Sequence, residues 1–173
     1  MPEERTGVVT FKGGPLTLVG PEIKVGSKAP DFKVLGEGLK EISLKDSAGK
    51  VRLISVVPSV DTPVCELQTK RFNEEASKLP ANVAVLTVSM DLPFAQGRFC
   101  NANNAKKIQA LSDHREASFG LNYGVLIKEL RLLARSIFVI GTDDKVKYVQ
   151  YVKEVVEHPD YDKALNAAKT AAS

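Results

Sequence analysis

Two apolar runs constrain the fold of this chain more than any other feature. The first extends from Val51 to Val57 and stops at Pro58, and the second extends from Val83 to Ser89. Both are short, nearly continuous and rich in β-branched residues, which is typical of strands buried on both faces of a sheet. Such strands need cover on both sides, so the chain is expected to pack helices on either face of a central sheet.

Further strands are predicted on either side of these runs. Two β-type segments, Gly7 to Phe11 and Leu16 to Val19, flank the turn sequence Lys12-Gly13-Gly14-Pro15 and predict an N-terminal hairpin. Near the other end, Ser136 to Ile140 and Val146 to Val152 predict two strands joined by a polar turn. These four segments and the two buried runs account for the expected strands.

Three helices are predicted between and after the strands. Apolar residues recur at helical spacing from Pro63 to about Lys78, and Pro159-Asp160-Tyr161 opens a terminal helix. The stretch from Phe94 to about Ala110 is expected to be a loosely held helix, because Gly97 and the cluster Asn101-Ala102-Asn103-Asn104 weaken it.

The order of elements is a hairpin, then β-α-β-α, then an antiparallel pair of strands and a final helix. This order predicts an α/β protein with a mixed central sheet flanked by helices, a thioredoxin-like fold. The 173 residues fit one domain, 1–173, and contain no internal repeat or interdomain linker.

Charge and hydropathy exclude several classes of protein. Lys and Arg total 24 against 21 Asp and Glu, and the small excess is spread along the chain, so nucleic acid is not an expected partner. The N-terminal Met1-Pro2-Glu3-Glu4-Arg5 does not resemble a secretory signal, and the apolar runs are too short to span a bilayer. We therefore expect a soluble, cytoplasmic protein that does not bind membranes.

The chain contains two cysteines, Cys65 and Cys100. A domain of this size does not need a disulfide to hold its core, so the pair indicates either redox chemistry or two buried spectator thiols. The two histidines, His114 and His158, have no cysteine nearby and no recognisable zinc spacing.

Cys65 lies at a position that favours nucleophilic chemistry. A buried strand stops at Pro58, and Pro63 suits the first position of the following helix, which makes Thr62 the natural N-cap. Cys65 then falls in the first helical turn, where free N–H groups and the positive end of the helix dipole stabilise a thiolate. The alternative is a core cysteine packed under the helix.

The segment Pro58-Ser59-Val60-Asp61-Thr62-Pro63-Val64-Cys65 matches the Pro-x-x-x-Thr/Ser-x-x-Cys signature and so resembles the peroxiredoxins. Its Asp-Thr-Pro-Val-Cys wording is similar to the bacterial thiol peroxidases, an atypical two-cysteine subfamily. The resemblance covers nearly the whole chain through further matching blocks, which are Val9 to Gly13, Ala29 to Phe32, Arg98 to Cys100, Leu133 to Arg135 and Pro159 to Tyr161.

The resemblance implies a role for each of four residues in peroxide reduction. Cys65 is the peroxidatic residue, whose thiolate attacks hydrogen peroxide or an alkyl hydroperoxide to give a sulfenic acid and water or an alcohol. The hydroxyl of Thr62 binds the thiolate and the peroxide, and Pro58 shields the sulfur from water. Arg135 favours the thiolate and holds the peroxide oxygens. Taken alone, Thr62 could be only a helix cap and Arg135 only a solvated charge.

The resemblance also implies how the enzyme is recycled. Cys100 matches the resolving cysteine, which closes an intramolecular disulfide with Cys65. Because a disulfide needs Cα atoms within about 7 Å, the family unwinds locally around both cysteines. Thioredoxin then reduces the exposed disulfide. A homodimer is implied, and no flavin, haem or metal cofactor.

Three other functions fit the sequence less well. A thioredoxin-type oxidoreductase needs a Cys-x-x-Cys pair, but positions 62 and 68 are Thr and Gln. Phosphate binding at the helix N-terminus would lack a glycine-rich loop. A non-enzymatic interaction domain would give no reason for Thr62 and Arg135 to accompany Cys65.

Overall fold

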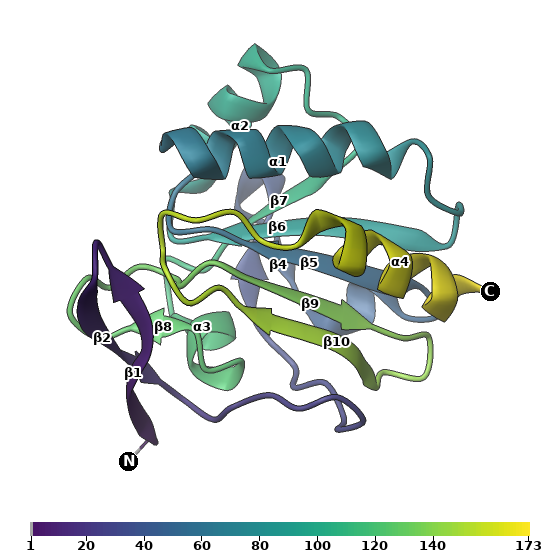
Figure 1. Ribbon diagram of the computed structural model, residues 1–173. Helices are drawn as coiled ribbons and strands as arrows, with labels where there is room; N and C mark the ends of the chain where they lie inside the picture. The colour runs from purple at the N-terminus through teal and green to yellow at the C-terminus, as the bar shows by residue number, and fades with distance from the viewer. Residues whose placement is uncertain (1) are drawn as a thin grey trace.

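The central sheet has seven strands in a computed structural model that describes residues 2–173 (Figure 1). The strands run in the order β10-β9-β5-β6-β7-β3-β4. β5 pairs in parallel with β6, and β6 with β7, whereas β9 is antiparallel to β5. Their bounds are β3 Val34–Leu35, β4 Glu41–Ile42, β5 Val51–Val56, β6 Val83–Ser89, β7 Gln109–Ser112, β9 Ser136–Ile140 and β10 Val146–Tyr151. The mixed sheet predicted from the sequence is therefore confirmed.

Alternate residues of the central strands face two different cores. Val51 and Leu53 of β5 pack in a core with residues of helices α1, Pro63–Ala76, and α4, Tyr161–Ala172. Ile54 and Val56 pack in the core on the opposite face, with residues of helix α3, Ser118–Asn122. All six residues of β5 are buried, as the apolar run predicted, because both faces of the strand are covered.

The N-terminal hairpin lies beside the second core and forms a small sheet of its own. Strands β1, Glu4–Phe11, and β2, Gly14–Val19, pair antiparallel, and β2 also pairs with β8, Leu126–Ile127. Lys12 and Gly13 form the turn with φ angles of 50° and 82°, the left-handed values that a two-residue hairpin turn requires. The predicted hairpin is confirmed. Its turn consists of Lys12 and Gly13, and not of the whole predicted turn sequence Lys12-Gly13-Gly14-Pro15.

The predicted helix from Phe94 to Ala110 is wrong beyond Ala102. Helix α2 spans Pro93–Ala102, Asn104 adopts a left-handed φ of 52°, and β7 begins at Gln109. The asparagine cluster ends the helix because asparagine tolerates the left-handed conformation. The chain can then enter the sheet beside β6. Two 3-10 helices, η1 Glu37–Leu39 and η2 Leu44–Ser47, complete the described elements.

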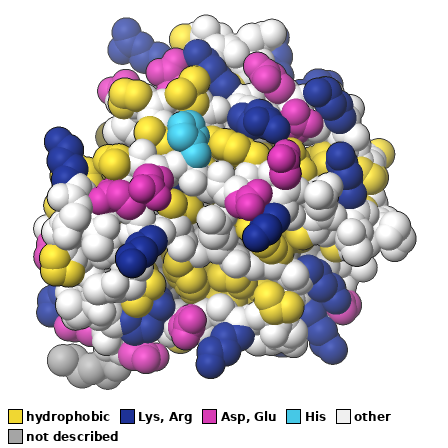
Figure 2. Space-filling model, viewed as in Figure 1, with side chains coloured by type: hydrophobic (Ala, Val, Ile, Leu, Met, Phe, Trp, Pro, Cys, Tyr) yellow, Lys and Arg dark blue, Asp and Glu magenta, His cyan; other side chains and the backbone are white. Residues whose placement is uncertain are grey.

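Charged side chains of both signs are mixed on the face of the molecule that Figure 2 shows. No helix within residues 2–173 is both long and apolar enough to cross a bilayer.

Asp113 is a buried carboxylate that supports the start of α3. Its side chain is 1% exposed and accepts hydrogen bonds from the backbone N–H groups of Phe119, at 2.9 Å, and Gly120, at 2.8 Å. Burial outweighs these bonds and raises the pKa of Asp113 to about 6.

This raised pKa predicts a pH dependence of stability. The folded pKa lies above the unfolded value of about 3.9, so the contribution of Asp113 is fully present below about pH 4 and is lost as pH rises through 6. The loss is on the order of 2–3 kcal/mol. Urea unfolding between pH 4 and pH 7 should show the free energy of unfolding of the wild type falling relative to that of Asp113→Asn, which has no carboxyl group to ionise at this position. Parallel profiles of the two proteins would contradict it.

Candidate active site

The start of α1 places Cys65 in a buried position. β5 ends at Val56, Pro58 is buried behind it, and Pro63 occupies the first position of the helix. Cys65 lies in the first turn and is 0% exposed. The helix start predicted from the sequence is confirmed, and the thiol sits where backbone N–H groups and the helix dipole favour a negative charge.

Thr62 occupies the N-cap position, but its side chain does not cap the helix. Its hydroxyl donates a hydrogen bond to the carbonyl of Ser59 at 3.3 Å, within the turn that precedes α1. The N-cap position predicted for Thr62 is therefore confirmed, but its side chain makes no cap hydrogen bond to the helix. The hydroxyl turns back into the loop because that carbonyl offers a local partner.

Arg135 lies 70 positions after Cys65 in the sequence and places a positive charge beside it. It directly precedes β9 and is 2% exposed. Its Nη2 lies 3.1 Å from the Cys65 sulfur, its Nη1 donates to Gln68 Oε1 at 2.8 Å, and its Nε donates to the Val155 carbonyl at 2.9 Å. The fold thus places the guanidinium directly against the thiol of Cys65.

The two buried arginines of the chain differ in their charge partners. Arg52, which is 0% exposed, forms a 2.7 Å ion pair with Asp144. Arg135 forms no ion pair with an Asp or Glu anywhere in residues 2–173. A buried charge without a counter-charge is strongly destabilising. Of the hydrogen-bond partners of Arg135 within residues 2–173, only Cys65 has an acidic proton and can carry a negative charge.

Gln68 belongs to the site, although sequence reasoning missed it. It is fully buried on α1, three residues after Cys65, and its Nε2 donates to Ser55 Oγ at 2.7 Å while its Oε1 accepts from Arg135. These two bonds fix the orientation of the amide and therefore of the guanidinium. A polar residue three positions from Cys65, on the same helix face, was the available signal.

Asp91 is a second residue that sequence reasoning missed. It follows β6, and its carboxylate accepts hydrogen bonds from Ser59 Oγ at 2.7 Å, from the Val60 N–H at 2.8 Å and from Ser89 Oγ at 2.7 Å. The loop before Cys65 is therefore tied to the end of the neighbouring strand. β5 and β6 are parallel, so the segments that follow them meet at one edge of the sheet.

Cys100 lies near this site on α2 but is not bonded to Cys65. Both thiols are free, and Cys100 is only partly buried. Phe99, the residue before it, packs against a cluster formed by Val57, Val60 and Cys65. Burial raises the pKa of the Cys100 thiol, so the packed helix keeps this cysteine protonated.

The two halves of α2 are held very differently. Gln96 is 2% exposed, and its Nε2 donates to Ser89 Oγ at 2.9 Å and to the Leu111 carbonyl at 2.8 Å. Gly97 follows, and the space where its side chain would lie is open. Cys100 itself lines a surface groove. The first half of the helix is hydrogen-bonded to the sheet through Gln96, whereas the half that carries Cys100 is held by the packing of Phe99.

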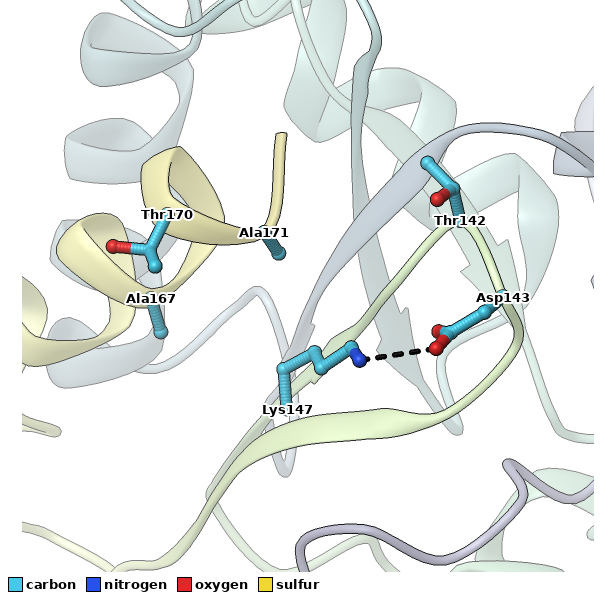
Figure 3. Close-up of a pocket in the computed structure, with 6 residues that line it drawn as sticks. All are labelled: Thr142, Asp143, Lys147, Ala167, Thr170 and Ala171. Carbon is cyan, nitrogen blue, oxygen red and sulfur yellow. Dashed lines mark hydrogen bonds and ion pairs between the residues drawn. The ribbon is translucent and has the colours of Figure 1, made fainter. Parts of the chain in front are cut away.

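Another pocket lies away from these residues and carries no comparable chemistry. Figure 3 shows that it is formed by the β9–β10 turn and the end of α4, with Lys147 paired to Asp143 at 3.1 Å and Thr142, Ala167, Thr170 and Ala171 around them. In the described part of the chain, no group of three His, Cys, Asp or Glu residues could hold a metal ion.

Comparison with known proteins identifies the family. Residues 24–165 match the Redoxin family. The thiol peroxidase of Halalkalibacterium halodurans is 60% identical over 163 residues, which are 94% of this chain and 98% of that protein. The thiol peroxidase of Bacillus subtilis is 60% identical over 161 residues, 93% of this chain and 96% of its own.

Solved structures agree with the fold. The crystal structure of a peroxiredoxin-like protein from Aquifex aeolicus superposes with a TM-score of 0.89 at 46% identity, covering 96% of this chain and 97% of that one. The thiol peroxidase of Chromobacterium violaceum, at 21% identity, shares the fold with a TM-score of 0.80 over 90% and 91% of the two chains. The chain therefore belongs to the Redoxin family and, within it, to the bacterial thiol peroxidases.

Proposed function

We propose that this protein, acting as a single domain of residues 1–173, reduces hydroperoxides with Cys65 as the peroxidatic cysteine. The observation that carries the proposal is the 3.1 Å contact between Arg135 Nη2 and the Cys65 sulfur, made by a buried guanidinium that forms no ion pair with a carboxylate of residues 2–173. The charge of Arg135 favours the thiolate, which is the nucleophilic form of cysteine.

In the first step the Cys65 thiolate attacks the terminal oxygen of the hydroperoxide. A sulfur–oxygen bond forms, the oxygen–oxygen bond breaks, and a proton taken up by the departing oxygen completes the alcohol or water. Cys65 becomes a sulfenic acid. Arg135 stabilises the developing negative charge, the Thr62 hydroxyl is positioned to bond the peroxide once it turns from Ser59, and the buried Pro58 shields the sulfur from water.

In the second step Cys100 attacks the sulfenic sulfur of Cys65, a disulfide forms and water leaves. The raised pKa of Cys100 favours the thiol while α2 is packed, and unwinding the second half of the helix exposes the thiol to water, where the thiolate forms more readily. Gln96 is hydrogen-bonded to the sheet, whereas the space around Gly97 is open. We therefore expect the helix to unwind only beyond Gln96, in the part that contains Cys100.

The disulfide has to be reduced before the next cycle. We propose thioredoxin as the reductant, working in the cytoplasm, because an exposed disulfide between unwound segments is accessible to a protein dithiol. Hydrogen peroxide and alkyl hydroperoxides are the proposed substrates, and a homodimer is the proposed assembly. These assignments rest on the resemblance to the thiol peroxidases.

Intact mass measurement of single-cysteine variants tests the two cysteine roles. One equivalent of an organic hydroperoxide should remove two hydrogens from the reduced wild type within seconds, mapped to a disulfide between Cys65 and Cys100. Cys100→Ser should gain one oxygen at Cys65 and stall, and Cys65→Ser should not react. Full turnover by Cys65→Ser would refute the proposal, and slow, scattered oxidation of the wild type would favour an interaction domain with ordinary thiols.

Gly97→Ala tests whether unwinding of α2 limits the second step. An alanine fits the open space at this position and stabilises a helix interior by about 1 kcal/mol relative to glycine. Opening therefore becomes less favourable, and disulfide formation should slow by about fivefold, while peroxide attack on Cys65 keeps its rate constant. Stopped-flow measurement after one equivalent of peroxide separates the two phases.

Ala102→Gly is the matched opposite change, because Ala102 is exposed in the last turn of the same helix. It should speed disulfide formation. The same rate of disulfide formation in all three proteins would show that opening of α2 does not limit resolution.

A further inference from the structure

The N-terminal hairpin lies against the segment between β10 and α4 (Figure 1). The Thr10 N–H donates to the Lys153 carbonyl at 2.7 Å, and the Val155 N–H donates to the Thr10 carbonyl at 2.8 Å. The two segments are distant in sequence: Thr10 and Glu154, for example, are 144 positions apart. The block Val9 to Gly13, which resembles the thiol peroxidases, therefore has a partner in the folded chain.

The carboxylate of Glu154 reinforces this junction. Its Oε1 accepts hydrogen bonds from Thr10 Oγ1 at 3.1 Å and from the Gly13 N–H at 2.9 Å, and its Oε2 accepts from the Val156 N–H at 3.1 Å. The left-handed turn at Lys12 and Gly13 presents the Gly13 N–H to the carboxylate. The N–H bonds from Gly13 and Val156 hold the pKa of Glu154 below its ordinary value.

Val155, the next residue, connects this junction to the active site. Its carbonyl accepts the Nε–H of Arg135 at 2.9 Å, and its side chain is 5% exposed. The Val155 N–H is bonded to the hairpin. The Glu154 carboxylate is bonded to the hairpin and to the Val156 N–H, so the residues on either side of Val155 are held as well. The carbonyl that orients Arg135 is therefore fixed by contacts with the hairpin.

We infer that the N-terminal hairpin is a positioning element for the active site: through Glu154 it fixes the Val155 carbonyl that holds Arg135 against Cys65. Glu154 acts through Arg135 and does not touch the sulfur, so it is a positioning residue. The inference rests on the role proposed above for Arg135. It predicts that a change at the tip of the hairpin alters the rate of peroxide attack.

Glu154→Gln tests the inference. A glutamine has one acceptor oxygen and directs its NH₂ group at backbone donors, so at least one bond is lost. The rate constant for peroxide attack, measured by stopped flow on Cys100→Ser protein, should fall by about tenfold. In the Arg135→Ala background the same change should have no further effect, because the guanidinium through which Glu154 acts is missing.

Glu129→Gln is the matched control. The Glu129 carboxylate also accepts a hairpin N–H, that of Thr17, at 3.0 Å, but no hydrogen bond leads from it to Arg135 in residues 2–173. It should keep the wild-type rate constant. Thr10→Val replaces the hydroxyl that bonds Glu154 Oε1 with a methyl group and leaves the carboxylate in place, so it should lower the rate constant less than Glu154→Gln. If Glu154→Gln does not fold, a rate constant in Thr10→Val equal to that of the wild type would contradict the inference.

Two results would overturn the inference while leaving the role of Arg135 intact. One is an unchanged rate constant in Glu154→Gln, and the other is an equal loss in the wild-type and Arg135→Ala backgrounds, which would indicate a general structural effect. If Arg135→Ala itself attacks peroxide at the wild-type rate, the role proposed for Arg135 fails, and the inference fails with it.

Discussion

The contact between the buried guanidinium of Arg135 and the thiol of Cys65 is the interaction on which the site depends. Burying a charge is unfavourable unless it is paired and hydrogen-bonded. Two nitrogens of the guanidinium donate hydrogen bonds to Gln68 Oε1 and to the Val155 carbonyl. The third nitrogen, Nη2, faces the Cys65 sulfur. The missing counter-charge is then available only when Cys65 is a thiolate, so the energetics of the fold and the reactivity of the cysteine are coupled.

The proposed mechanism combines a rigid first step with a second step that needs motion. The loop before Cys65 is hydrogen-bonded to Asp91, and α1 is hydrogen-bonded through Gln68 to β5, so the Cys65 sulfur is held in place. Cys100 lies instead on the second half of α2, beyond the hydrogen bonds of Gln96. In the proposed mechanism, accurate placement serves peroxide attack, and local unwinding of α2 serves the later meeting of two cysteines that start on separate helices.

The sequence predicted those parts of the fold that are specified locally. Strands β5, β6 and β9 were recognisable because both of their faces are apolar, and the start of α1 because Pro63 follows a polar turn. The two-residue strands β3, β4 and β8 carry too few residues for a pattern, and β7 was mistaken for the end of a helix because its pairing with β6 is a tertiary contact.

The site was predictable only where a motif marks it. Cys65 could be singled out from its helix position, whereas Arg135 and Cys100 needed the family resemblance. Gln68, Asp91 and Glu154 were missed because their most distant hydrogen-bond partners lie 67, 32 and 144 residues away, respectively. Hydrogen bonds across such separations follow from the assembled fold and leave no local pattern.

The most direct test of this account is the ionisation state of Cys65 in the resting protein. The thiolate absorbance in the ultraviolet would be measured for reduced Cys100→Ser protein, with the variant lacking both cysteines as the blank. The account predicts about one thiolate per chain at neutral pH, and its loss in Arg135→Met, whose side chain fills the space without the charge. A neutral thiol in the first protein, or an undiminished thiolate in the second, would contradict the claim that Arg135 and Cys65 form the charge pair.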